Sequence, residues 1–184
     1  MILKKRYSNI EELIKTNLNS NEDAKTLKLM KSIKCVKKRG YFTKNEFLKM
    51  GMWKSPRPKQ QYLKNPEEDI ISISKKVLAT KSESQRIELL TALKGVSIPT
   101  ASAILTLIDP KNYGVIDIRA WQILFLYGSV KIKQMGTNFD FNNWYDYMVK
   151  LRFYAEKFKV SVRDIERIMF LHHKEIQTKN LYKH

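Results

Sequence analysis

Apolar residues recur along this chain at helical spacing, every third or fourth position, in a series of short segments. The clearest apolar face runs from Trp144 to Phe158, and weaker ones follow Ser8, Thr43 and Ser161, which are residue types that favour helix N-caps. No segment alternates with the period of two that a half-buried strand requires, apart from a brief run at 114–116. The pattern predicts an all-α fold of about eight to ten short helices.

Capping and breaking residues predict where particular helices begin and end. Ser8 and Thr43 are each followed three residues later by a glutamate, which is the spacing of a capping box. A single helix is expected over 22–38, and the helix after Thr43 should end at Gly51. Asn65-Pro66 has the residue types of an N-cap and a first helical position.

Aromatic residues on the apolar faces are expected in the core. Trp144 and Tyr147 lie on the most regular stripe, and Trp121 has the same place in a helix predicted over 117–127. The sequence from His172-His173 onward is polar. These two histidines are expected in an exposed tail rather than at a metal, because adjacent residues of a helix point in different directions.

The charge balance indicates a protein that binds polyanions rather than an ordinary helical domain. The 184 residues include 35 Lys and Arg against 18 Asp and Glu, a net charge of +17, while the hydrophobic content of 43% is ordinary for a folded protein. Such an excess favours phosphate neutralisation and counterion release. A lysine-rich solvated surface is the alternative explanation.

Cysteine content and hydropathy exclude several other classes. The one cysteine, Cys35, rules out an internal disulfide and a four-cysteine zinc or iron–sulfur site. The N-terminus has no apolar core of signal-peptide length, and no run approaches the roughly 18 apolar residues of a membrane span. We therefore expect a monomer without membrane contact, located in the cytoplasm.

The least charged stretch, Leu93 to Leu124, contains the candidate chemistry. It opens with a glycine-bearing turn inside a helical hairpin predicted over 84–108. A hairpin of this kind can direct successive backbone N–H groups and a helix N-terminus at one phosphate. The candidate contact residues are Lys94, Gly95, Val96, Ser97 and Thr100. An ordinary helix–helix turn is the alternative reading.

One acid, Asp117, follows the hairpin and is set among apolar neighbours at the start of the helix predicted over 117–127. A rigidly held, poorly solvated carboxylate can stabilise a developing positive charge. A plain N-cap is the other reading, and the two roles are compatible. Asp109 before Pro110 reads as a helix stop, and Asp164 and Glu166 read as acids that favour a helix dipole.

The pattern LxGVxxxTASAIL followed by VIDIRAWQIL resembles the helix-hairpin-helix DNA glycosylase superfamily. Its members carry an LPGVG-type hairpin and an aspartate in a VD-type segment that begins a later helix. The match covers Leu90 to Gly128, with the acid on Asp117. The resemblance implies a two-lobed all-α fold with a cleft between the lobes, hairpin binding to double-stranded DNA, and base excision with Asp117 as the catalytic acid.

The chain departs from this pattern at three positions. Lys94 stands in place of the usual proline, and Ser97 in place of the usual second glycine. In the family, hairpin carbonyls hold a monovalent cation, which is the only cofactor that the resemblance suggests. The two replacements leave open whether this chain binds it. Pro99 stands where members with lyase activity have a lysine. Since proline has no free amine, Schiff-base lyase chemistry at that position should be absent.

A base pocket needs flat apolar walls and a few polar groups. The loop expected over 52–59 is stiffened by two prolines, and its Trp53, Lys54 and Arg57 could stack on a base or meet a phosphate. Tyr41 lies nearby in the sequence and is included as a fourth candidate. Anchoring of Trp53 to the core is the competing reading, and Lys54 is the one lysine considered as a displaced nucleophile.

The sequence thus favours one domain over 1–184, a monofunctional DNA glycosylase that excises a damaged or modified base with water as nucleophile. Neither a redox cofactor nor a catalytic metal is expected. A non-catalytic hairpin module that recognises damaged or distorted DNA is the first alternative, and a basic RNA or protein adaptor is the second.

Overall fold

The computed structural model describes residues 3–18 and 21–177, and within them it is entirely helical. It has eleven α-helices and no strand in those ranges, so the all-α prediction is confirmed. The helices are α1 (Ile10–Thr16), α2 (Ala24–Ser32), α3 (Val36–Arg39), α4 (Lys44–Lys54), α5 (Lys59–Leu63), α6 (Glu67–Ala79), α7 (Glu83–Thr91), α8 (Ile98–Ile108), α9 (Ile118–Leu126), α10 (Phe141–Phe158) and α11 (Val162–Ile176).

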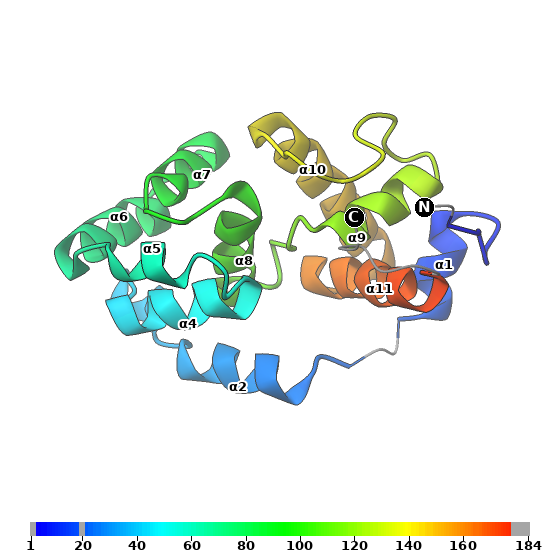
Figure 1. The fold of residues 1–184 in the computed structure, drawn as a ribbon. Helices are drawn as coiled ribbons and strands as arrows, with labels where there is room; N and C mark the ends of the chain where they lie inside the picture. Colours follow the sequence, from blue (N-terminus) through cyan, green and yellow to red (C-terminus); the bar gives the residue numbers. More distant parts are fainter. Residues whose placement is uncertain (1–2, 19–20, 178–184) are drawn as a thin grey trace.

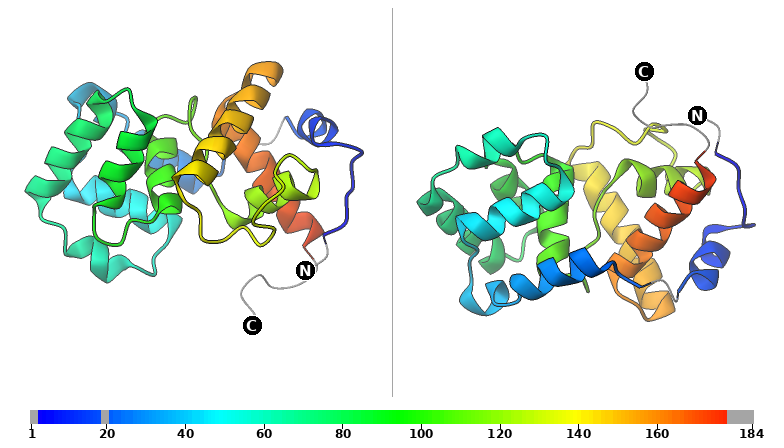
Figure 2. Two further views of the ribbon diagram at one scale, coloured as in Figure 1. Left: turned by 90° about the horizontal axis from the view of Figure 1, so that it is seen from above. Right: turned by 60° about the horizontal axis from the view of Figure 1, so that its bottom comes forward.

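The helices lie in two groups, with the segment between α8 and α9 running from one to the other (Figure 1). Helices α4 to α8 form the group on the left, where α4 packs on α8 and α6 on α7. Helices α9, α10, α11 and α1 form the group on the right, where α11 packs on both α9 and α10. Figure 2 shows α2 running along the base of the left-hand group, with its N-terminal end toward the right-hand group. The cleft between lobes stays a prediction.

The predicted helix starts at Thr43 and Ser161 are confirmed by their caps, since each closes a capping box with the residue three positions later. Asp140 closes a further capping box at the start of α10, and Ser82 accepts the Gln85 N–H at the start of α7. These reciprocal bonds satisfy N–H groups that the helix leaves unpaired.

The predicted boundaries of α1, α2 and α6 are wrong. Helix α1 is capped by Asn9, which accepts the Glu12 N–H at 2.9 Å, while Ser8 instead donates to the Glu12 carboxylate. The helix expected over 22–38 is interrupted after Ser32 and continues only as the short α3. Pro66, not Asn65, is the N-cap of α6.

Helix α4 does not end at Gly51 but continues to Lys54. Gly51 is buried under the Tyr62 ring, where an added Cβ would lie 3.0 Å from Cε2. The glycine therefore serves close packing against α5 rather than a helix stop. The helix ends before Pro56, as expected for a residue that excludes helical backbone from its predecessor. Trp53 and Lys54 are thus on a helix and not on a loop.

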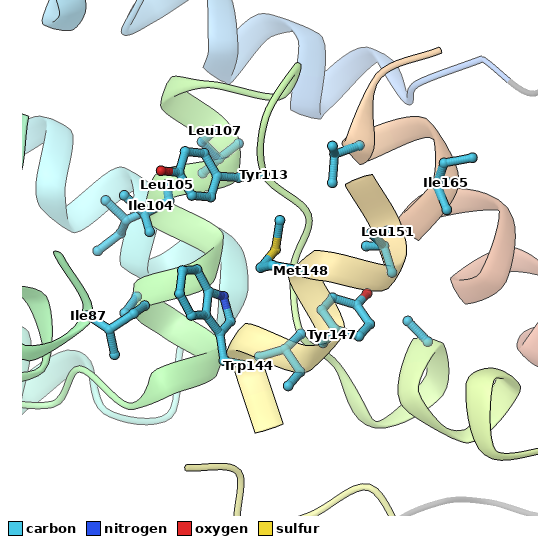
Figure 3. Packing of buried hydrophobic residues seen from close by; sticks show 14 of the residues in the cluster. Ile87, Ile104, Leu105, Leu107, Tyr113, Trp144, Tyr147, Met148, Leu151 and Ile165 are labelled. Atoms are coloured by element: carbon cyan, nitrogen blue, oxygen red, sulfur yellow. The ribbon is translucent and has the colours of Figure 1, made fainter. Parts of the chain in front are cut away.

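The core joins the two helix groups around α10. Trp144, Tyr147 and Trp121 are buried, as predicted. Figure 3 shows Trp144 and Tyr113 together at the α8 side of α10, with their rings stacked 6.4 Å apart, and Leu151 further along toward Ile165 of α11. This packing fixes α10 between the groups.

The prediction that His172 and His173 lie in an exposed tail is wrong. Helix α11 continues to Ile176, and both imidazoles are buried on its inner face. His173 Nε2 lies 2.6 Å from the Gln122 Oε1 on α9, which gives one ring nitrogen a partner inside the core. The remainder of the predicted tail, 178–184, lies outside the described residues.

Candidate active site

Asp117 is fixed at the N-terminus of α9 by a connection held on two sides. The Ser102 hydroxyl accepts the Ile116 N–H at 3.1 Å, and the Tyr147 hydroxyl donates to the Val115 carbonyl at 2.9 Å. Asp117 is the N-cap of α9, and its Oδ1 accepts the Arg119 N–H at 2.9 Å. The sequence prediction of a carboxylate at a helix start is therefore confirmed.

The second oxygen of Asp117 has a partner that the sequence did not reveal. Lys54 Nζ, from the last turn of α4, donates to Asp117 Oδ2 at 2.5 Å. Both side chains are largely buried, with 16% and 19% of their surfaces exposed. Asp117 is thus not bonded only to its own helix, as a purely structural cap would be.

The net electrostatic effect holds Asp117 ionised. Burial by itself raises the pKa of this carboxyl, but the Lys54 ammonium and the Arg119 N–H outweigh burial and hold the pKa below its usual value. At neutral pH the site therefore presents a fixed negative charge in a poorly solvated place.

The first pocket at Asp117, here called the tryptophan-side pocket, has a volume of about 360 Å³. Helices α2, α4 and α11 and the start of α9 form it. Its lining residues are Asp23, Thr26, Trp53, Lys54, Val115, Asp117, Arg119, Arg163, Glu166 and Phe170. The pocket combines two aromatic side chains with ionisable groups of both signs.

Trp53 forms part of this wall and is itself anchored. Its indole N–H donates to Thr26 Oγ1 at 2.9 Å, and the Arg163 guanidinium lies 5.4 Å from its ring centre. The competing reading that Trp53 is held to its neighbours is therefore correct, and it is compatible with a place in the pocket wall.

A second pocket, here called the hairpin-side pocket, also has a volume of about 360 Å³. Its lining residues are Lys54, Ser55, Pro56, Arg57, Ser97, Pro99, Thr100, Ile116, Asp117, Ile118 and Phe139. Lys54 and Asp117 line both pockets. The ion pair therefore stands between a pocket at the helical hairpin and a pocket walled by Trp53.

The hairpin itself is tightly built against α5. Gly95 has φ +85°, and a Cβ there would lie 2.9 Å from the Gln61 Cβ and 3.0 Å from the Tyr62 ring. Asn65 accepts the Lys94 N–H at 2.8 Å and donates to the Lys94 carbonyl at 3.0 Å. Asn65 thus braces the hairpin turn instead of capping a helix.

These contacts change which hairpin groups can reach a ligand. Val96 and Thr100 are buried, so the prediction that the Thr100 side chain faces outward to DNA is wrong. The Thr100 hydroxyl lies 3.2 Å from Ser97 Oγ, at the wall of the hairpin-side pocket. Lys94 and Ser97 are the exposed members of the predicted set.

The hairpin carbonyls offer a poor fit to a bound cation. The Leu93 carbonyl accepts the Val96 N–H at 3.1 Å, and the Lys94 carbonyl accepts from Asn65. Two hairpin carbonyl oxygens are thus already engaged within the protein.

The structure separates the four residues predicted for the base pocket. Trp53 and Lys54 line the tryptophan-side pocket, and Arg57 lines only the hairpin-side pocket. Tyr41 lines neither. Its ring lies 4.7 Å from the Arg39 guanidinium and 5.5 Å from Lys75 Nζ, away from Asp117.

The other predicted acids fall into different roles. Asp109 pairs with Lys37 at 2.9 Å, away from both pockets, and Asp164 closes the capping box of α11. Glu166, read from the sequence as an acid near a helix start, is instead buried in the tryptophan-side pocket. A helical wheel could have shown this, because Glu166 lies four residues after buried Val162 on α11.

Arg163, Arg119 and Phe170 are further pocket residues that the sequence did not single out. No signal in the sequence distinguishes these arginines from the many surface cations. Their place depends on how α11 packs against α4 and α9, which local pattern does not determine.

No protein-family model matches the chain, and searches of curated proteins and of solved structures give no match. Among the described residues, no helix is long and apolar enough to cross a bilayer. Across the same residues, no group of three His, Cys, Asp or Glu side chains is placed to hold a metal ion.

Proposed function

We propose that this protein is a monofunctional DNA glycosylase that removes a damaged or modified base by hydrolysis. One observation carries the proposal. The Lys54–Asp117 pair lines both the hairpin-side pocket and the tryptophan-side pocket. An enzyme that cleaves an N-glycosidic bond needs its carboxylate at this kind of boundary, between the sugar-phosphate backbone and the extruded base.

The tryptophan-side pocket is the better receptor for the base. Its volume of about 360 Å³ lies within the roughly 300–1,000 Å³ range of small-ligand sites. Trp53 and Phe170 supply flat apolar surface, and the surrounding charged groups can meet polar edges of a base. An extruded base would enter here while its phosphates stay on the hairpin side.

Asp117 then acts on the sugar. As the bond to the base breaks, positive charge builds on the sugar ring, and a carboxylate that is already ionised and rigid stabilises this charge without reorganisation. The Arg119 N–H and Lys54 hold the carboxylate in one orientation. Water then adds to the anomeric carbon, and Asp117 or solvent takes its proton.

Lys54 supports Asp117 in this mechanism and is not the nucleophile. An ammonium paired with a carboxylate has no free electron pair for attack on the sugar. Pro99, at the position that carries the lysine in lyase members of the resembling family, has no free amine either. The expected products are a free base and an intact abasic strand.

The positive surface accounts for substrate capture. The net charge of +17 favours duplex DNA at low salt, and Lys94, Ser97 and Arg57 lie at or beside the hairpin-side pocket. The backbone N–H groups at the start of α8 add favourable electrostatics for a phosphate.

A non-catalytic DNA-binding module is the second candidate. The observation in its favour is that both Asp117 oxygens already accept hydrogen bonds within the protein, one from the Arg119 N–H and one from Lys54. Incubation with duplexes carrying alkylated, oxidised or deaminated bases, followed by alkali, separates the two. Strand breaks at the modified base support the glycosylase, while tight binding without breaks across the panel supports the module.

A further inference from the structure

The tryptophan-side pocket contains a second buried carboxyl group besides Asp117. Glu166 lies one turn into α11 with only 2% of its side chain exposed. Gly114 packs against it so closely that a Cβ at 114 would lie 3.0 Å from the Glu166 Cβ. Both Glu166 and Asp117 line this pocket, whereas only Asp117 lines the hairpin-side pocket.

Positive charge around Glu166 is shared with other acids. Arg163 Nη1 donates to Glu166 Oε2, but Arg163 Nε also donates to Glu22 at 2.7 Å. Arg167 contacts Glu22 at 3.5 Å and Asp164 at 2.8 Å. Glu22, Asp164 and Glu166 thus share two guanidinium groups, so one of the three carboxyl groups can be neutral. Glu166 is the most buried of them, and burial disfavours the charged form most strongly there.

The other titratable groups near Glu166 come from four elements. Asp117 at the start of α9 disfavours a second negative charge, and Lys54 of α4 favours one while already paired with Asp117. Tyr147 of α10 faces the same region as a buried, neutral phenol. From the N-terminus of α2, Asp23 lines the pocket but accepts from Thr26.

The pKa values of Glu166 and Asp117 are consequently shifted in opposite directions. Burial raises the pKa of Glu166, with Asp117 adding to the rise and Arg163 and Lys54 opposing it. The pKa of Asp117 is held below its usual value. Two carboxyls whose environments separate them in this way commonly divide the roles of proton donor and anion.

We propose that Glu166 is a second catalytic residue, the acid that protonates the departing base while Asp117 stabilises the sugar. This inference rests on the proposed glycosylase function. The bond between the anomeric carbon and the base breaks, and its electron pair passes to the base. A ring nitrogen of the base takes the proton from Glu166. Water supplies hydroxide to the sugar, and the proton it releases restores Glu166 through solvent.

The assignment defines a substrate class. A neutral base is a poor leaving group until it is protonated, so a pocket with a proton donor suits neutral lesions such as hypoxanthine or 8-oxoguanine. A base that already carries positive charge, such as 7-methylguanine, needs no proton to depart. The proton sits on Glu166 Oε1, because Oε2 accepts from Arg163.

The test compares the full-length wild type with Glu166→Gln on duplexes that carry hypoxanthine, 8-oxoguanine or 7-methylguanine. Glutamine keeps the shape of the side chain but supplies no acidic proton. Single-turnover release of a neutral base should fall by roughly 100-fold, the lower end of general-acid effects. Release of 7-methylguanine should persist, and the ratio of the two rates in one sample is independent of the folded fraction.

A pH profile of the wild type provides a second readout. Release of a neutral base should decline as pH rises through the pKa of Glu166, with no such decline for 7-methylguanine. Equal loss of neutral and cationic substrates in Glu166→Gln would overturn the role of Glu166 while leaving the glycosylase intact. Wild-type release of 7-methylguanine alone would overturn it too, and release of no base from any duplex would refute both the role and the enzyme.

Discussion

At the residue scale, the geometry of the candidate active site depends on one ion pair between distant parts of the chain. Lys54 and Asp117 are 63 positions apart, and their side chains meet at 2.5 Å. Lys54 offsets the effect of burial on the Asp117 carboxyl and so keeps it ionised. The value of the pair to the proposed reaction is therefore electrostatic, and removing the cation should change the protonation of the acid.

We predict that Lys54→Met raises the pKa of Asp117, because burial then acts with less opposition. The folded-state pKa is lowered in the wild type, so ionised Asp117 persists as pH falls until that pKa is reached. In the variant the acidic limb of the rate profile should move to higher pH. Single-turnover rates across pH measure this, with Lys49→Met on the same helix as the control. An unmoved limb would contradict the electrostatic role.

At the element scale, the hairpin is positioned by packing as much as by its own turn. Gly95 lies against Gln61 and Tyr62, and Asn65 bonds both backbone groups of Lys94. Helix α5, the 64–66 segment and the hairpin thus support one another. Loss of this support should affect stability and DNA binding together.

Gly95→Ala should destabilise the protein more than Gly128→Ala. Both glycines have positive φ, of 85° and 73°, so both alanines carry a left-handed backbone cost of about 1–2 kcal/mol. Only at Gly95 would the new methyl group collide with neighbours, which adds about 1–3 kcal/mol of overpacking. Urea unfolding measures the difference, and equal costs would show that α5 yields to the methyl group.

Helix α11 should make the fold sensitive to mild acid. Burial lowers the pKa of His173 to about 4 from its usual value of 6.5. The stability that depends on neutral His173 is fully present above the unfolded pKa of 6.5 and is lost as pH falls toward 4. At pH 5 the loss in unfolding free energy is about 2 kcal/mol. In His173→Gln the decline in unfolding free energy between pH 7 and 5 should be smaller by that amount. An unchanged decline would place the acid sensitivity elsewhere.

The local sequence pattern was sufficient to predict a helical fold and the position of Asp117 at the start of a helix, because caps and apolar stripes are encoded within a few residues. It failed where a residue serves a distant neighbour. Gly51 reads as a helix stop but accommodates Tyr62, and Asn65 reads as a cap but braces Lys94. Lys54 and Glu166 reach Asp117 only through helix packing, which the sequence pattern does not determine.

At the scale of the whole molecule, the proposed function combines the charge with the two pockets that meet at Lys54 and Asp117. In that proposal a net charge of +17 attracts DNA without regard to sequence, and the hairpin and pockets add a specific place for one nucleotide. Capture and chemistry should therefore respond differently to salt, since only capture depends on releasing counterions.

The logarithm of the DNA-binding constant should fall linearly with the logarithm of salt concentration, and Lys94→Ala should reduce the slope by about 0.9 if Lys94 meets one phosphate. Lys76→Ala is a suitable control because Lys76 is exposed on α6, which lines neither pocket. Fluorescence anisotropy over a salt series measures both slopes. Affinity that ignores salt would contradict every nucleic-acid reading of this protein.

The most direct test is single-turnover base excision by Asp117→Asn beside Asp109→Asn. Asparagine can still cap α9 but carries no charge to stabilise the sugar cation. We predict that Asp117→Asn lowers excision by roughly 100- to 1,000-fold with DNA affinity retained, and that Asp109→Asn, remote from both pockets, leaves the rate unchanged. Excision at the wild-type rate by a folded Asp117→Asn protein would contradict the proposed active site.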